Sequence, residues 1–397
     1  MTYVFIILAS VLIYFSVKSL HGGFEYLQFF RRSLADRSDQ FTPFASVIAP
    51  CRGIDQGMSD NLLALLTQDY PDYEVIYVVD DADDEAVPLI ERAAAEFANT
   101  KLVVAPRAVG SSQKVENLRE AVTHVRDDSH VFVFVDSDSR PSKSWLSNLI
   151  APLSDPNIGA ATGYRWFISP NPTFASELRS VWNASVASNL GPDTAKNFCW
   201  GGAMAIARST FERVGMLEKW KGTLSDDFTV TRGMRDAKLP IVFVPEALSA
   251  SVENCTLREM VEFTTRQMKI TRVYDAPLWT LSFIGSGLFC LVMSAALLIA
   301  ILSSLNDAIV WFSIATLAIV SICSVGKAWL RLNAVKLVLT EYQVELDRQF
   351  LSQITLWALT PIIFFYNSVA ALFSRRLLWR GTQYILKSHR ETVIIAD

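Results

Sequence analysis

Four long stretches without a charged residue constrain the fold more than any other feature of the sequence. They cover residues 2–17, 276–305, 308–326 and 350–374. Each is near or above the length that an α-helix needs to cross the roughly 30 Å hydrocarbon core of a bilayer. The chain is 51% hydrophobic and only 19% charged, which would leave a soluble protein too little polar surface. The sequence therefore predicts an integral membrane protein.

The first apolar stretch could be mistaken for a cleaved signal peptide. It lacks a basic leader, and no small-x-small cleavage site follows it in SVKSLHGG, so we expect residues 1–20 to form a retained transmembrane anchor. The other stretches predict a C-terminal transmembrane region over residues 276–374 and a basic tail over residues 375–397. Because Pro361 interrupts the last stretch, we expect a re-entrant or broken hairpin there, which would return the tail to the cytosolic face.

Cysteine content and net charge argue against two classes of site. The five cysteines are odd in number and far apart, and none has metal-ligand spacing. We therefore expect free thiols in a reducing compartment, not a zinc site or a disulfide frame. The net charge is -4 and no basic stripe is interleaved with aromatic residues, so we expect no nucleic-acid partner.

From Ser46 onward, short apolar stretches alternate with amphipathic ones. We predict strands at 46–50, 74–80, 101–105 and 130–135, and helices at 60–68, 84–97 and 114–125. This alternation predicts a parallel sheet with helices on both faces, in which ligands bind beyond the carboxyl ends of the strands. After Pro152 the pattern loosens into mixed strands at 158–162, 203–207 and 241–244, and helices at 173–189 and 225–236.

Two aspartates follow the predicted strand VFVFV directly. Asp136 and Asp138 would offer a divalent cation two hard oxygen ligands and leave its other positions to phosphate oxygens. The alternative is that they only cap a turn before Pro141. The uniformly apolar strand, and a second acidic strand end upstream, favour a site for Mg²⁺ or Mn²⁺.

Two further acidic segments have both a capping and a ligand-binding interpretation. In DDADD, Asp84 is a suitable N-cap for the following helix, whereas Asp80 and Asp81 come too early for that role, so we expect one of them to contact a ligand. In SDDF, Asp226 and Asp227 open a helix, where acids complement the helix dipole. A carboxylate there could also act as a general base on a hydroxyl.

Six segments follow one another along the chain: APCRG, DYPDYEVIYVVDDADDEAV, VGSSQKVENLREAV, DSDSRP, CWGGAMAIARSTFERVG and SDDF. They precede an amphipathic stretch at 258–275, which we expect to lie at the bilayer interface. Together these segments resemble a family 2-type glycosyltransferase with a Rossmann-like GT-A fold, and most closely the ceramide glucosyltransferase group, family 21. The resemblance covers about residues 41–272, which include a predicted catalytic domain at 41–257, and returns in WRGTQY.

The resemblance assigns roles to individual residues. It places Asp81 near the uracil and ribose of a nucleotide sugar, and Asp136 and Asp138 at the metal and diphosphate. It makes Asp227 the catalytic base, with Asp226 beside it. Further donor-binding positions are Pro50, Arg52, Asp80 and Lys114. Lys114 could instead be a solvated helix start.

Two segments leave alternatives open. Where the family has R/Q-x-x-R-W, this chain has Arg266, Lys269 and Ile270, so a donor-binding cation is kept but the tryptophan is lost. That loss argues against a processive polysaccharide synthase. Trp200, Gly201 and Gly202 could form a close-packed acceptor loop, or a turn with a core tryptophan.

The resemblance implies inverting transfer of a hexose, with glucose from UDP-glucose as the first expectation. Membrane helices around one catalytic domain favour a lipid acceptor, of ceramide type first, then diacylglycerol, a hopanoid or a polyprenyl phosphate. We expect the catalytic domain to face the cytosol, at a bacterial inner membrane or, in a eukaryote, at the ER or Golgi. A non-enzymatic transport component is the alternative class, although the apolar stretches lack the intramembrane charges typical of one.

Overall fold

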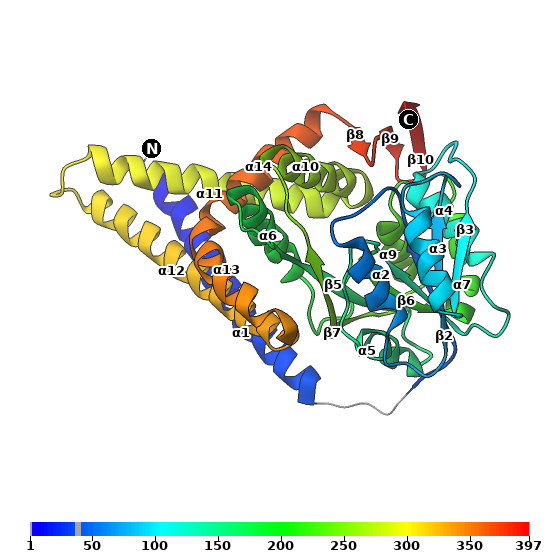
Figure 1. The fold of residues 1–397 in the computed structure, drawn as a ribbon. Coiled ribbons are helices and arrows are strands. Elements are labelled where there is room, and N and C mark those ends of the chain that lie inside the picture. Colours follow the sequence, from blue (N-terminus) through cyan, green and yellow to red (C-terminus); the bar gives the residue numbers. More distant parts are fainter. Residues whose placement is uncertain (1, 36–40, 397) are drawn as a thin grey trace. The chain divides into compact units, whose positions relative to one another are not determined.

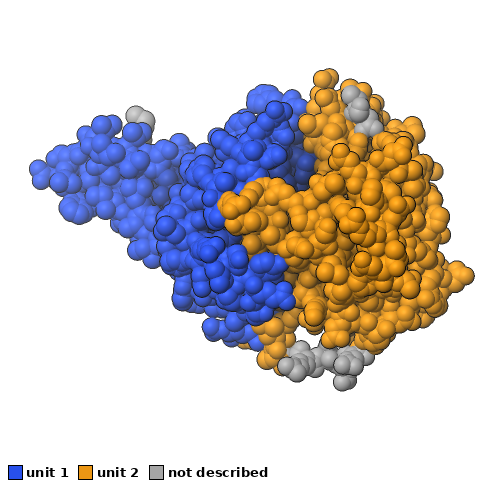
Figure 2. All heavy atoms as spheres, in the orientation of Figure 1, with its two compact units in different colours: residues 1–31, 172–188, 255–374 blue, residues 32–171, 189–254, 375–397 orange. Residues whose placement is uncertain are grey.

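The computed structural model describes residues 2–35 and 41–396, which divide into two compact units (Figures 1 and 2). Unit 1 comprises Met1–Arg31, Pro172–Ser188 and Cys255–Ser374. Unit 2 comprises Arg32–Asn171, Asn189–Asn254 and Arg375–Asp397. The units cut across the predicted domain boundaries, because a helix from within residues 41–257 joins unit 1 and the tail joins unit 2.

A seven-stranded sheet with the order β3-β2-β1-β4-β6-β5-β7 forms the centre of unit 2. The strands are β1 (Ala45–Pro50), β2 (Tyr73–Val79), β3 (Thr100–Val104), β4 (Val131–Val135), β5 (Ala160–Ile168), β6 (Ala203–Ala207) and β7 (Ile241–Val252). β1 pairs in parallel with β2 and β4, whereas β6 is antiparallel to both β4 and β5. The predicted parallel sheet is therefore present, and its one reversed strand, β6, lies in the part of the chain where mixed strands were predicted.

Alternating side chains of these strands face two layers of helices. On one face, Ile76 and Phe134 belong to a core that includes residues of α4 (Gln113–Val122), α7 (Arg208–Arg213), α8 (Met216–Lys219) and α9 (Asp226–Asp236). On the other face, the hydroxyl of Tyr77 donates a hydrogen bond to the carbonyl of Leu62 in α2 (3.2 Å). The remaining helices of this unit are α2 (Met58–Leu66), α3 (Val87–Glu96), α5 (Trp145–Ile150) and η1 (Ala151–Ser154). Such two-sided burial explains why the strands read as continuous apolar runs.

Unit 1 is helical. It contains α1 (Thr2–Ala35, as far as residue 31), α6 (Phe174–Ala187), α10 (Leu257–Tyr274), α11 (Ala276–Leu302), α12 (Ala308–Lys336), η2 (Thr340–Tyr342), α13 (Gln343–Thr355), η3 (Leu356–Ala358) and α14 (Leu359–Phe373). Ala9 and Leu12 of α1 pack against Val292 of α11 and Val320 of α12. Within the described residues, four segments are long and apolar enough to cross a membrane: Thr2–Ala35, Ala276–Leu302, Ala308–Lys336 and Thr340–Phe373.

Two of these segments differ from the predicted apolar stretches. α12 continues past residue 326 and carries three cations there, Lys327, Arg331 and Lys336. Lys327 donates a hydrogen bond to Ser19 (3.0 Å) and Arg331 donates one to Gln353 (3.1 Å). The last stretch is interrupted at η3, and Pro361 lies in the first turn of α14, where its missing N–H costs little. The predicted break is thus a short 3₁₀ segment just before the proline.

Candidate active site

The acidic segments predicted from sequence converge at one edge of the sheet. β1, β2 and β4 are parallel, so the residues that follow them emerge at the same edge. Asp136 follows β4 directly, and Asp80 follows β2. The DSD segment is further tied to the loop after β1, because Ser137 donates a hydrogen bond to Asp55 at 2.6 Å. Unlike Asp80 and the DSD pair, Asp55 was not predicted as a site residue.

Asp136 and Asp138 share one arginine from β5. Arg165 lies 3.5 Å from the Asp136 carboxylate and 3.1 Å from that of Asp138, and only 11% of its side chain is exposed. Burial raises the pKa of Asp138, outweighing the opposing effect of Arg165. Burial also acts to raise the pKa of Asp136, but Lys114 and Arg165 together hold it below its ordinary value. The Asp138 carboxyl group therefore binds a proton more tightly than that of Asp136.

Lys114 connects the DSD segment to the start of α9. Its ammonium group lies 2.7 Å from Asp136 and 3.3 Å from Asp226. Burial alone would lower the pKa of Lys114, but Asp136, Asp226 and Asp227 raise it above its usual range. Only 15% of the Lys114 side chain is exposed, so Lys114 is a largely buried, charged member of the site and not a solvated helix start.

The two aspartates of the SDD segment differ in environment. Asp226 is buried, and burial raises its pKa to about 6 although Lys114 opposes this. Asp227 is more accessible; it accepts hydrogen bonds from Ser225 and from the Phe228 amide (2.7 Å), and its second oxygen accepts a longer one from the Gly201 amide (3.3 Å). Ser225 is the N-cap of α9, and its side chain accepts a hydrogen bond from the Phe228 amide.

The segment Trp200-Gly201-Gly202 packs closely against these carboxylates. A Cβ on Gly201 would lie 2.3 Å from an oxygen of Asp226, so only glycine fits there. A Cβ on Gly202 would lie 2.1 Å from the Trp200 ring. That ring is buried and has the Arg165 guanidinium 4.8 Å from its centre. Trp200 thus supports Arg165, and its contact with an acceptor stays a prediction.

The acids after β2 have a simpler environment. Arg107 pairs with both Asp80 (2.5 Å) and Asp81 (2.7 Å), and Asp80 is buried whereas Asp81 is 47% exposed. A hydrogen bond from the Asp83 amide lowers the pKa of Asp81, and Arg107 lowers it further. Asp81 is therefore the member of the pair that a ligand can reach.

The capping role considered for Asp84 is wrong. Helix α3 begins at Val87 and its N-cap is Ala86. Asp84 instead accepts hydrogen bonds from the amides of Ala86 (2.8 Å) and Gly53 (3.0 Å), so it links this turn to the loop after β1. That loop begins after Pro50, the last residue of β1, and includes Arg52.

Arg266 and Lys269 lie three residues apart on α10, in unit 1, and are not part of the unit that holds the acidic segments. The Arg266 guanidinium lies 5.6 Å from the centre of the Phe263 ring. Burial lowers the pKa of Lys269. The predicted contact of these cations with a donor stays a prediction.

Sequence reasoning missed Arg165, Arg107 and Asp55. Arg165 gave a usable signal, since it is the one charged residue within the apolar strand AATGYRWFI. Arg107 and Asp55 lie in loops without such a pattern, and their partners are 26 or more residues away in the sequence.

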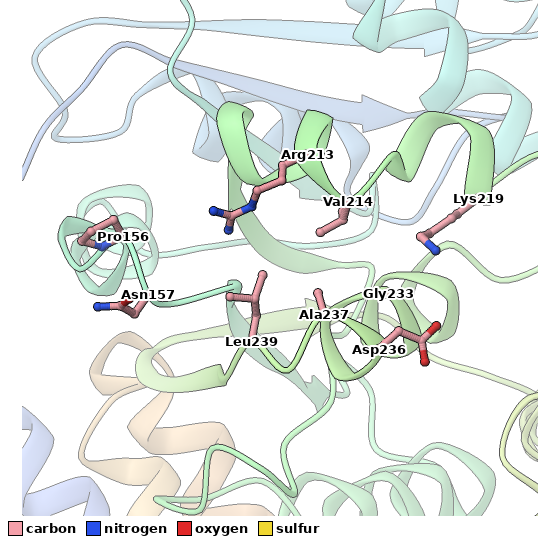
Figure 3. A pocket seen from close by; sticks show the side chains of 9 residues that line it. All are labelled: Pro156, Asn157, Arg213, Val214, Lys219, Gly233, Asp236, Ala237 and Leu239. Carbon is pink, nitrogen blue, oxygen red and sulfur yellow. The ribbon is translucent and has the colours of Figure 1, made fainter.

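Another hollow of unit 2 lies at the opposite edge of the sheet (Figure 3). Its lining residues come from segments 156–157, 213–219 and 233–239. Two of these segments immediately precede β5 and β7, which run parallel to each other, so the hollow is next to the amino ends of these strands. None of its lining residues was predicted for the site.

Comparison with known proteins identifies the family of this chain. The family model for glycosyl transferase family 21 matches residues 3–392. The chain belongs to glycosyl transferase family 21. The sheet just described is the GT-A fold expected from the sequence.

Curated relatives of this family 21 chain are named for N-acetylglucosamine, whereas the sugar first expected from the sequence is glucose. An N-acetylglucosaminyltransferase of Bradyrhizobium diazoefficiens is 25% identical over 312 residues, which are 71% of this chain and 62% of that protein. An N-acetylglucosaminyltransferase of Rhizobium leguminosarum bv. viciae is 27% identical over 228 residues, 53% of this chain and 51% of that protein. The chain thus spans between half and two thirds of the length of these relatives.

Among solved structures, a mannosyltransferase from Pyrobaculum calidifontis in complex with GDP-Man and Mn²⁺ has a TM-score of 0.52. It is 20% identical, and the match covers 84% of this chain and 99% of that one. At this identity the likeness supports the fold alone.

The DSD segment fits a divalent cation. Among the described residues, Asp138 Oδ1 is buried and has no hydrogen-bond partner, so a cation would satisfy an acceptor that otherwise costs free energy. No group of three or more His, Cys, Asp or Glu side chains in the described part of the chain forms a metal cage. Two carboxylates alone suit a cation that keeps positions for phosphate oxygens.

Proposed function

We propose that this glycosyltransferase moves a hexose from a UDP-sugar to the hydroxyl of a membrane lipid, with inversion at the sugar. The observation that carries the proposal is the network of Asp136, Asp138, Lys114 and Asp226 at the carboxyl edge of the sheet. It combines a pair of carboxylates suited to Mg²⁺ or Mn²⁺ with a buried cation, which together match a diphosphate. Bound there by Asp136 and Asp138, the cation would offset the charge that develops on the leaving diphosphate.

Asp227 is the proposed general base. The acceptor oxygen attacks the anomeric carbon while its proton moves to Asp227; the bond to the diphosphate oxygen breaks and leaves its electron pair on UDP. Asp227 is suited to this role because it is accessible and one of its oxygens accepts only a long hydrogen bond. Asp226 is the poorer base because it is buried against Lys114, and it instead keeps that cation in place.

Glucose is the first sugar we propose and a ceramide-type lipid the first acceptor, on the family resemblance. N-acetylglucosamine is the second candidate sugar, because the curated relatives are named for it. Diacylglycerol, a hopanoid or a polyprenyl phosphate are the other acceptors to test. The apolar helices of unit 1, with exposed side chains such as Leu281 and Trp311, support a lipid acceptor over a soluble one.

Purified full-length protein tests this function directly. We expect UDP release from one member of a panel of UDP-sugars with Mn²⁺ or Mg²⁺, stimulated by one class of lipid, and a glycolipid product identified by mass. Asp227→Asn should lower the rate by about 10²- to 10⁴-fold, the usual contribution of a general base. No release with any donor would contradict the proposed enzyme, and undiminished release by Asp227→Asn would contradict the proposed base.

We also propose that the chain crosses the membrane an even number of times between α10 and the tail. Unit 2 contains both the sheet and residues 375–397, so these two parts lie on one side of any membrane. α11 and α12, with 27 and 29 residues, would supply two crossings. The segment interrupted at η3 would then enter and leave on the cytosolic side.

Cysteine labelling in sealed cells tests this arrangement. In a background without the natural cysteines, Ser388→Cys should resist an impermeant reagent applied from outside. Asn306→Cys, in the loop between α11 and α12, should react and serves as the control. Labelling of Ser388→Cys from outside would contradict the arrangement.

A further inference from the structure

The tail folds into a small sheet that contacts the loops of the candidate active site. Its strands are β8 (Arg376–Trp379), β9 (Thr382–Ser388) and β10 (Glu391–Ala396), all antiparallel. Arg52, in the loop after β1, donates a hydrogen bond to Thr382 at 2.8 Å. The amide of Gln113, next to Lys114, donates one to the Tyr384 hydroxyl at 3.2 Å. The tail is therefore built into the same unit as the acidic segments.

The turn between β8 and β9 contains an unusual residue. Its two residues, Arg380 and Gly381, have φ angles of +48° and +85°. Two-residue turns of this kind favour Asn, Asp or Gly, and a residue with a Cβ costs about 1 kcal/mol in the left-handed region. Arginine brings no advantage to the turn itself, so its side chain is the feature that needs an explanation.

That side chain reaches the DSD segment through a single intermediary. Arg380 pairs with Asp55 at 2.5 Å, and the other oxygen of Asp55 accepts the hydrogen bond from Ser137, which lies between Asp136 and Asp138. Asp55 is almost fully buried, whereas 42% of the Arg380 side chain is exposed. The carboxylate thus fixes the guanidinium while part of it stays accessible beside the site.

Arg380 differs from the two other cations of this region in its carboxylate partner. Lys114 and Arg165 are paired with Asp136, Asp138 and Asp226. Arg380 is paired with Asp55, which is not among the carboxylates assigned to a metal or to the base. A guanidinium has five N–H donors in a planar fork that matches phosphate oxygens, so one carboxylate partner does not exhaust it.

We propose that Arg380 is a donor-binding residue whose guanidinium contacts the diphosphate of the nucleotide sugar, so that the C-terminal sheet completes the donor site. This inference rests on the proposed function, because it requires a diphosphate at Asp136 and Asp138. Asp55 is then a positioning residue that orients Arg380. The tail contributes to binding of the donor and not only to the stability of unit 2.

Binding of UDP and of uridine to full-length protein in nanodiscs, with Mn²⁺ present, tests the inference. Arg380→Gln should weaken UDP binding about 10- to 100-fold, the range for a charge-assisted hydrogen bond, and leave uridine binding unchanged because uridine has no diphosphate. Arg380→Lys should restore part of the affinity for UDP. Lys387→Gln is the matched control, since it removes a cation of β9 that pairs only locally with Glu391 (3.2 Å).

The possible outcomes separate this inference from the proposed function. Wild-type protein that binds no UDP would overturn the proposed function and the inference with it. Wild-type protein that binds UDP no better than Arg380→Gln would overturn the inference alone. Equal losses for UDP and uridine in Arg380→Gln and Arg380→Lys would assign Arg380 a purely structural role and also overturn it.

Discussion

The aspartates that follow β2 and those that follow β4 occupy equivalent positions at the edge of the sheet, but their partners differ. Asp80 and Asp81 share Arg107, which is 49% exposed. Asp136 and Asp138 share Arg165, which is 11% exposed, and Asp136 also pairs with Lys114, which is 15% exposed. Water screens the first set, whereas burial strengthens every charge interaction in the second. The same sequence signal therefore leads to two sites of different electrostatic strength.

Asp138→Asn should show the largest effect. It removes one of two carboxylates that would hold the cation, so we expect kcat/KM for the UDP-sugar to fall about a thousandfold, consistent with the several kcal/mol that a metal contributes. Stimulation by Mn²⁺ should be lost as well. A steady-state assay at several Mn²⁺ concentrations measures both effects. If Asp138→Asn kept its response to Mn²⁺, the aspartates after β4 would not differ from those after β2 in holding the cation.

The pH dependence should report on Asp226, with an intermediate effect. Burial raises its pKa to about 6, so its carboxyl group gains a proton as the pH falls through that value and its interaction with Lys114 weakens. We expect kcat/KM to decline roughly tenfold per pH unit below this point. Asp226→Asn should be slower, but its kcat/KM should not show this decline at low pH. The same decline in the variant would show that a group other than Asp226 titrates.

Asp81→Asn should show the smallest effect. Asp81 is half exposed and outside the buried network, so we expect the KM for the UDP-sugar to rise about three- to tenfold, the range of one hydrogen bond, with little change in kcat. Michaelis curves with saturating lipid measure this. A loss as large as that of Asp138→Asn would mean that the two strand ends are equally important for catalysis.

Local patterns predicted the parts of the fold that depend on neighbouring residues. The apolar runs of β1, β2 and β4 predicted these strands and, for β2 and β4, the acids that follow them, and the SDD segment predicted the start of α9. Mixed strands were predicted after Pro152, but not which of them is reversed, because strand direction depends on pairing with distant residues. The β8–β10 sheet was missed. The contacts of Arg165 with Asp138 and of Arg380 with Asp55 were missed as well, since these partners are 27 and 325 residues apart in the sequence.

The affinity of the protein for UDP, measured by calorimetry with and without Mn²⁺, tests the central claim most directly. That claim is that Asp136 and Asp138 hold a cation together with the diphosphate of a nucleotide sugar. Wild-type protein should bind UDP at least about tenfold more tightly with Mn²⁺, and Asp138→Asn should lose this gain while still binding UDP weakly. Equal affinity with and without Mn²⁺ in the wild type, or an undiminished gain in Asp138→Asn, would contradict it.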